Sequence, residues 1–214
     1  MINFKVKIPP KASNSKIENF FIKKGLKEMI NLSKAKSKGV NDMIHLSPYK
    51  PELKDLYNLY NYITLNKRIT ILEFGSGWSS LIMAMALNEL KKKYFKEVKK
   101  LRRNNPFELF ILENEKKFLK ITKRKLDSFT KKNDIKIKIH YCFSTVKMIK
   151  YNGNIASEYT KLPLCNPDFV YVDGPDQFNI LGNINGINIG HKDMMPMICD
   201  PLKFEYFYTP GTII

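Results

Sequence analysis

The stretch Ile69-Thr-Ile-Leu-Glu-Phe-Gly-Ser-Gly-Trp-Ser-Ser80 decides the fold of this chain. Its first half is a short apolar run rich in β-branched and aromatic residues, which is typical of a strand buried on both faces of a parallel sheet. Gly75 and Gly77 permit backbone angles and a close ligand approach that a Cβ atom would obstruct. Ser79 or Ser80 can cap the apolar helix that follows. The stretch predicts the nucleotide-binding corner of a doubly wound α/β fold, with an ordinary glycine turn as the alternative.

Strands and helices alternate along the rest of the chain, which predicts a mostly parallel sheet with right-handed crossovers. The expected strands cover residues 108–113, 135–141, 168–173 and 211–214, and the expected helices run over about residues 79–103 and 115–131. Alternating polarity in residues 135–141 favours an edge strand with one face in water. We therefore expect an α/β domain over residues 67–214, preceded by a helical accessory region over residues 1–66.

The accessory region is expected to form helices that pack beside the sheet or cover the site. Ser15 and Glu18 have the spacing of a capping box, and the helix after them reaches about Leu32. A polar connection follows over residues 34–41. Pro51 can occupy the first turn of a second apolar helix.

Composition bounds the class of protein. The 214 residues are 43% hydrophobic, which fits a single globular core. No apolar run approaches the ~18 residues of a membrane span, and the first residues lack the apolar centre of a signal peptide, so a cytoplasmic setting is expected. Cys142, Cys165 and Cys199 are odd in number and lack C-x-x-C spacing, which favours reduced thiols over disulfides or zinc ligands.

The formal net charge of +17 is compatible with a polyanionic partner or an anionic membrane surface. Most of this charge is lysine spread over the expected helices, beside abundant asparagine and isoleucine, a mixture also typical of an AT-rich genome. No recognisable nucleic-acid module or arginine-rich stripe accompanies it. Nucleic-acid binding is therefore an alternative that the sequence does not favour.

Acidic residues stand at the carboxyl ends of three expected strands. These are Glu73, Glu113 and Asp173. In an open parallel sheet such ends form one crevice, so the three side chains are expected to converge. A carboxylate after the second strand can accept hydrogen bonds from both hydroxyls of a ribose. The alternative for Glu113 is a solvated charge at a strand end.

At this point a family resemblance can be named. The segment Glu73-Phe-Gly-Ser-Gly77 resembles the first motif of class I S-adenosylmethionine-dependent methyltransferases, and Glu113 is similar to their ribose-binding acid. The resemblance covers about residues 69–214 and implies a Rossmann-like fold with S-adenosylmethionine as the cofactor. The segment Asp168-Phe-Val-Tyr-Val-Asp-Gly-Pro-Asp176 resembles a subgroup with Asp-Gly-Pro after strand four.

The resemblance also implies roles for individual residues. By position, Gly75, Ser76 and Gly77 would lie beside the methionine part of the donor, and Glu73 would help to hold it. Two further cofactor-binding candidates fall where the family lines its adenine pocket, and these are Ser144 and Thr145.

Two features depart from known patterns. Ser79 replaces the third glycine of the fuller family motif. The interval from Gly77 to Glu113 is 36 residues, whereas a dinucleotide-binding unit has about 20. This interval disfavours an NAD-dependent oxidoreductase, which remains a third possibility.

The turn Asp173-Gly174-Pro175-Asp176 is the expected catalytic end. Methyl transfer from a sulfonium is an in-line displacement, so a protein mainly positions the acceptor and helps to remove its proton. Asp173 can act as the base, as the partner of an acceptor hydroxyl or, with Asp176, as a magnesium ligand. Magnesium is an option that we do not predict. The alternative is a turn in which the acids are incidental.

Residues 182–193 are expected to form an acceptor-binding lid that brings His191 over the crevice, or else a surface loop without chemistry. Residues expected to be structural rather than catalytic are His45, His140, Met194, Met195 and Met197.

The resemblance further implies a seven-stranded sheet, whereas the sequence stops at Ile214 within the expected fifth strand. We therefore expect a truncated protein that lacks strands six and seven, because an open apolar edge promotes aggregation. The leading hypothesis is methyl transfer to an oxygen or nitrogen of a small molecule or glycan. The alternatives are a basic nucleic-acid-binding protein, an RNA-directed methyltransferase and an NAD-dependent oxidoreductase. The acceptor atom, metal use and oligomeric state stay open.

Overall fold

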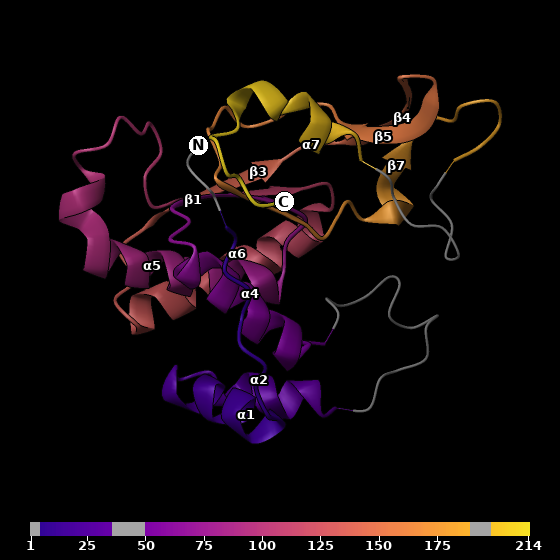
Figure 1. Ribbon diagram of the computed structural model, residues 1–214. Helices are drawn as coiled ribbons and strands as arrows, with labels where there is room; N and C mark the ends of the chain where they lie inside the picture. The colour runs from indigo at the N-terminus through magenta and orange to yellow at the C-terminus, as the bar shows by residue number, and fades with distance from the viewer. Residues whose placement is uncertain (1–4, 36–49, 189–197) are drawn as a thin grey trace.

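A four-stranded parallel sheet forms the centre of the computed structural model, which describes residues 5–35, 50–188 and 198–214 (Figure 1). Its strands are β1 (Thr70–Phe74), β2 (Glu108–Glu113), β3 (Lys138–Phe143) and β6 (Phe169–Val172). They lie in the order β3-β2-β1-β6, and every neighbouring pair is parallel. The expected α/β class is confirmed, and the arrangement is compatible with a Rossmann-like fold.

The end of the chain lies beside β6. Ile213 makes a single parallel bridge to Phe169. Its N–H donates to the Asp168 carbonyl, and its own carbonyl accepts the N–H of Val170. The segment expected as a fifth strand therefore takes the fifth position in the sheet, as one bridge rather than a full strand.

Five helices share one apolar core with one face of the sheet. They are α1 (Asn14–Lys23), α2 (Lys27–Ser33), α4 (Leu53–Leu65), α5 (Trp78–Val98) and α6 (Lys116–Lys132). In α4 the buried side chains recur at helical spacing, and they face α5. The first half of α5 is buried on all sides because it lies between the accessory helices and the sheet. The accessory helices thus extend the main core, as expected of helices beside the sheet.

The opposite face of the sheet is covered by a second, smaller sheet. Its strands are β4 (Val146–Tyr151), β5 (Asn154–Tyr159) and β7 (Ile180–Leu181), in the order β5-β4-β7. Among the described residues, the short helical segment η1 (Gln177–Asn179) precedes β7, and α7 (Asp200–Lys203) and η2 (Glu205–Phe207) come after it. Side chains of β4, β5 and β7 pack with Leu72, Phe74 and Leu112 in a second apolar cluster. The sequence analysis did not foresee this hairpin, which occupies the crossover between β3 and β6.

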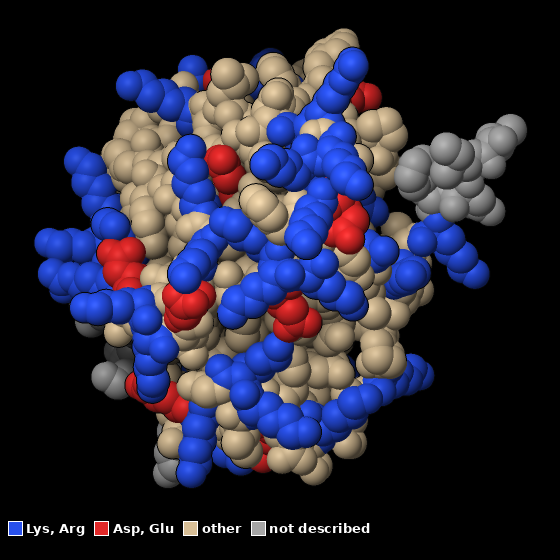
Figure 2. Space-filling view, turned by 90° about the vertical axis from the view of Figure 1, so that its left-hand side faces the viewer, with Lys and Arg blue, Asp and Glu red and all other residues tan. Residues whose placement is uncertain are grey.

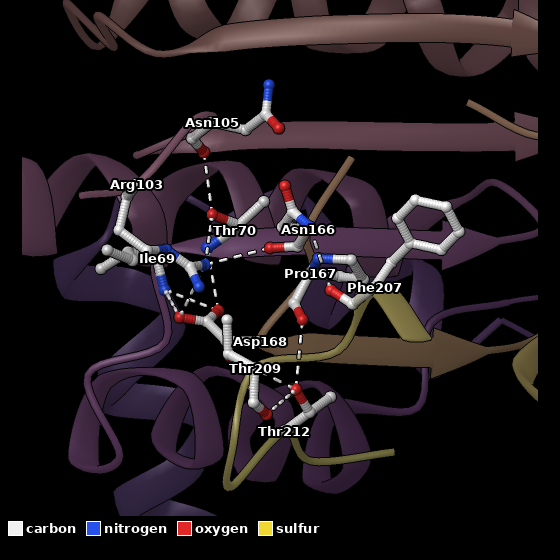
Figure 3. Close-up of polar contacts among 10 residues, drawn as sticks. All are labelled: Ile69, Thr70, Arg103, Asn105, Asn166, Pro167, Asp168, Phe207, Thr209 and Thr212. Carbon is white, nitrogen blue, oxygen red and sulfur yellow. Dashed lines mark hydrogen bonds and ion pairs between the residues drawn. The ribbon is translucent and has the colours of Figure 1, made fainter. Parts of the chain in front are cut away.

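Asp168 anchors the amino end of the sheet (Figure 3). Its buried carboxylate accepts the backbone N–H groups of Ile69 and Thr70 and lies 3.3 Å from Nη2 of Arg103. The same guanidinium donates to Thr70 Oγ1 and to the carbonyl of Asn166. Strands β1 and β6 are therefore joined at this end by charge-assisted hydrogen bonds.

Helix α5 ends at Val98 rather than near residue 103 as expected. The chain beyond the helix brings Arg103 to Asp168. Strand β3 begins at Lys138, three residues later than expected. No helix in the described part of the chain combines the length and the apolarity needed to cross a bilayer.

Two expected helix starts are wrong. Ser13, not Ser15, caps α1, because its Oγ accepts the N–H of Lys16 and Ser15 is already helical. Glu52 is the N-cap of α4, so Pro51 precedes the first turn instead of occupying it.

Candidate functional site

The acids expected to converge do so at the carboxyl edge of the parallel sheet. Glu73 is the penultimate residue of β1, Glu113 ends β2, and Asp173 directly follows β6. The Asp173 N–H donates to the Phe74 carbonyl, which holds the two strand ends side by side. The structure therefore places the candidate residues from three distant segments in one location.

Glu73 lies beneath the glycine turn and is fully buried. Its two carboxylate oxygens accept the hydroxyls of Ser79 and Ser80, each at 2.5 Å. Burial raises the pKa of Glu73 to about 8, against the lowering by the serine hydrogen bonds, and the charges on Asp173 and Glu113 add to the rise. Glu73 therefore ties β1 to the first turn of α5 and has no exposed surface for direct ligand contact.

Neither Ser79 nor Ser80 is the N-cap of α5, contrary to expectation. Gly77 is the N-cap, and Ser80 is the third helical residue, whose Oγ accepts the Gly77 N–H at 3.1 Å. The hydroxyl of Ser79 goes to Glu73. Ser79 thus has a defined role in holding the turn.

The two glycines of the turn have different surroundings. Gly75 has φ +105°, and a Cβ added there would lie 3.0 Å from the backbone of Asp173 and Gly174. A Cβ on Gly77 would meet nothing closer than Ser79 Oγ at 4.0 Å. The packing of the protein therefore requires glycine at Gly75, whereas Gly77 borders open space that a ligand can use.

Glu113 is 2% exposed, so its interpretation as a solvated strand-end charge is wrong. One carboxylate oxygen accepts the Ser76 hydroxyl at 2.6 Å, and the other accepts the N–H groups of Asn114 and Glu115. Burial raises the pKa of Glu113, while these hydrogen bonds oppose the rise. The Ser76 contact joins the glycine turn to the end of β2, at the place where a ribose hydroxyl is expected.

A hollow of about 270 Å³ lies beside the ends of β2 and β3. It is lined by Asn114, Glu115, Lys116, Phe143, Thr145, Asn179 and Leu181. Its volume is near the lower end of the ~300–1,000 Å³ typical of ligand pockets, so it suits a ring-sized group rather than a whole nucleoside with its tail.

The two expected adenine-pocket residues are adjacent but not equivalent. Thr145 lines the hollow. Ser144 is buried, its N–H donates to the Glu113 carbonyl, and its Oγ accepts the Lys161 N–H at 2.8 Å. Thr145 is therefore placed to touch a ligand, whereas Ser144 holds the loop.

The expected catalytic acids also differ. The carboxylate of Asp173 is exposed, and no described residue hydrogen-bonds to it; partial desolvation raises its pKa. Asp176 is tied down, because its N–H donates to Asn114 Oδ1 at 2.7 Å and its carboxylate accepts Asn179 Nδ2. Asp173 is thus the acid available to a ligand, and Asn114 is a positioning residue that sequence reasoning missed.

Sequence reasoning also missed Tyr159, which the end of β5 brings behind the site. Its side chain is 3% exposed, and its ring packs 5.6 Å from that of Phe74. The hydroxyl has no hydrogen-bond partner in the described residues. Burial raises the pKa of Tyr159 well above its usual value, and the charges on Glu113, Asp200, Glu73 and Asp176 add to this. The phenol therefore stays protonated and is an unused buried donor.

His140 stacks on Phe110 at 4.1 Å and contacts Glu108 at 2.6 Å, away from the carboxyl edge. The predictions for His45, His191, Met194, Met195 and Met197 lie outside the described residues. The described part of the proposed lid folds back on itself, with Asn188 Nδ2 donating to the carbonyls of Ile180 and Gly182.

The described residues contain no group of three or more His, Cys, Asp or Glu side chains that could hold a metal ion. Comparison of the sequence with models of known protein families finds no match, and comparison with curated protein sequences finds none either.

Proposed function

We propose that this protein is a Rossmann-like, S-adenosylmethionine-dependent methyltransferase acting on an oxygen or nitrogen of a small molecule or glycan. The observation that carries the proposal is the convergence of a glycine turn, a buried acid and an exposed acid at one sheet edge. The turn is residues 75–77, the buried acid is Glu113, and the exposed acid is Asp173.

The residues at this edge fit the donor. Gly77 borders open space, which suits close approach of the methionine part. The Ser76 hydroxyl now donates to the buried carboxylate of Glu113, so both groups would exchange this contact for contacts with the ribose hydroxyls. The hollow has an aromatic and an aliphatic wall from Phe143 and Leu181, which suits an adenine ring. The unused hydroxyl of Tyr159 is a further buried donor behind the site.

The chemistry that the bound donor supplies is an electrophilic methyl group on a sulfonium. The protein's own task is to align an acceptor and to take up its proton. Asp173 suits the second role, because the residue is exposed and its carboxylate has no hydrogen-bond partner among the described residues. Asn114 and Asn179 hold the turn on which Asp173 and Asp176 stand. No step of this proposal needs a metal ion.

Calorimetry with S-adenosylmethionine and its demethylated product tests the proposal, with NAD as the comparison ligand. We expect binding of the first two and not of NAD. Gly77→Val should abolish binding while leaving the fold intact, because the added side chain enters open space. Glu113→Gln should weaken binding about tenfold or more, and Glu97→Gln, an exposed acid on α5, is the matched control. A folded protein that binds neither compound would overturn the proposal.

A further inference from the structure

The exposed face of α6 is almost entirely basic. Of its nine exposed positions, seven are lysine or arginine, and the others are Asp127 and Ser128. The seven are Lys116, Lys117, Lys120, Lys123, Arg124, Lys131 and Lys132. They recur every three to four residues, so they form one stripe along a helix about 25 Å long.

The far half of α5 continues this surface. The exposed lysines are Lys92, Lys93 and Lys96 in the helix and Lys99 and Lys100 just after its end. Helices α5 and α6 pack against each other, and Lys91 Nζ donates to the carbonyl of Lys136 just beyond α6. Figure 2 shows the left-hand side of Figure 1, where α5 lies, and there lysine and arginine side chains spread over the face and outnumber the acids. We call the exposed lysines and arginines of α6 and of residues 92–100 the basic face.

The basic charge is concentrated rather than spread evenly. Residues 78–138 contain 18 lysines and arginines against 7 acids in 61 positions, whereas the other 153 positions contain 19 against 13. A lysine bias imposed by an AT-rich genome favours lysine at exposed positions, and α6 and the end of α5 have many of these. The net charge of these 61 positions is nevertheless +11 (18 − 7), against +6 (19 − 13) for the other 153.

The acids of this region do not neutralise the face. Asp127 pairs with Lys123 at 2.9 Å, and Asp134 pairs with Lys136 at 3.2 Å. Glu89 pairs with Lys24 of the accessory region, and Glu97 is the single acid among residues 92–100. In the described residues, no acid pairs with Lys120, Arg124, Lys131 or Lys132. The basic face therefore keeps an excess of positive charge. Its side chains repel one another, and together they attract a polyanion.

Partly exposed aromatic rings lie among the cations. Lys125 Nζ is 3.8 Å from the ring centre of Trp78, Lys123 Nζ is 4.5 Å from that of Tyr141, and Lys116 Nζ is 4.9 Å from that of Phe143. Bases of a single strand stack on such rings while lysines contact its phosphates.

We propose that the basic face binds single-stranded nucleic acid, with the end of the strand directed toward the hollow at the carboxyl edge of the sheet. Lys116 and Phe143 belong to both, because they line the hollow and stand where the stripe of α6 begins. A membrane surface fits less well. The apolar side of α6, with Leu126 and Phe129, is packed into the core. The exposed large apolar side chains beside residues 92–100 are Phe95 and Leu101, and they do not form the continuous apolar stripe of a helix that lies in lipid. This proposal does not depend on methyl-donor binding.

Fluorescence anisotropy of the full chain with a labelled uridine oligonucleotide of about 20 residues tests the proposal. We expect binding at about 50 mM salt, and log Kd should rise with log salt by about 0.7 for each phosphate contacted. The triple variant Lys120→Glu/Arg124→Glu/Lys131→Glu should lower affinity about 30-fold or more at about 100 mM salt. The matched control, Lys5→Glu/Lys11→Glu/Lys150→Glu, makes the same charge change at exposed positions elsewhere and should bind within about threefold of the parent.

Three outcomes would overturn the proposal. They are no oligonucleotide binding at low salt, an equal loss of affinity in the control variant, and binding to phosphatidylserine vesicles or duplex DNA in preference to the single strand. Circular dichroism of each variant verifies folding. Calorimetry of the triple variant with S-adenosylmethionine separates this proposal from the previous one, because donor binding should survive the charge reversal.

Discussion

Gly75 and Gly174 pack backbone against backbone. A Cβ on Gly174 would lie 2.8 Å from the Cα of Gly75, and a Cβ on Gly75 would lie 3.0 Å from the amide nitrogen of Gly174. This contact joins the turn after β1 to the turn after β6. The glycine motif and the Asp-Gly-Pro motif, almost a hundred residues apart, are therefore two halves of one structural unit.

Alanine at either glycine should destabilise the fold. We expect Gly174→Ala and Gly75→Ala to lower the free energy of unfolding by about 2–3 kcal/mol, because backbone rather than a flexible side chain meets the new methyl. Gly75 adds strain from its positive φ. Gly77→Ala is the matched control and should cost less than about 1 kcal/mol. Urea unfolding measures all three, and a Gly77 variant as unstable as the others would contradict this account.

The buried acid under the turn predicts a pH dependence of stability. The pKa of Glu73 is raised to about 8 in the folded protein from an ordinary value of 4.5, so the folded state binds a proton more strongly than the unfolded state. Stability should therefore fall as pH rises through the window from about 5 to 8. Glu73→Gln keeps the shape without the titration and should flatten this slope.

The stability of Glu73→Gln should still fall somewhat with pH, because other acids also have raised pKa values. One of them is Asp200, and burial raises its pKa to about 6. Glu97→Gln, on the surface of α5, should leave the slope unchanged. Unfolding measured from pH 5 to 8 provides the test. An identical slope in Glu73→Gln and the parent would show that Glu73 titrates normally.

The ion pair at the opposite end of the sheet predicts a large effect of one arginine. Arg103 and Asp168 are both nearly buried, and removal of the guanidinium leaves a carboxylate with only backbone partners. We expect Arg103→Met to cost about 3 kcal/mol of unfolding free energy. Its exposed neighbour gives the control, since Arg102→Met should cost less than about 0.5 kcal/mol. Similar losses in both variants would mean that the pair contributes little.

The sequence predicted the parts of the fold that local pattern determines. The apolar runs of β1, β2 and β6 mark buried strands, and the glycines after β1 mark the turn. The hairpin of β4 and β5 was missed, although a signal was present. Asn152 and Gly153 both have positive φ, as the type I′ hairpin turn requires, and Asn-Gly is the preferred pair for that turn.

The missed site residues could not be found from local pattern. Asn114 is a site candidate because its side chain accepts the backbone N–H of Asp176, 62 residues away. Tyr159 is one because the hairpin that carries it packs on the sheet. The distinct environments of Asp173 and Asp176 also arise from tertiary contacts, since Asn179 and Asn114 hold only the second. Sequence reasoning located the edge at which the site forms, and packing decides which side chains are free to act there.

The variant Tyr159→Phe tests two effects of the buried Tyr159 hydroxyl. One is its effect on the stability of the free protein, and the other is its contribution to ligand binding. The hydroxyl is desolvated without a partner in the described residues, so its removal should stabilise the free protein by about 1 kcal/mol. If the donor or acceptor takes that hydroxyl on binding, the same variant should bind it about tenfold more weakly. Tyr141→Phe is the control of opposite sign, because its hydroxyl donates to Asp127 at 3.3 Å and its loss should be slightly destabilising. Urea unfolding and calorimetry measure the two effects, and a destabilised Tyr159→Phe would show that the hydroxyl is already paired in solution.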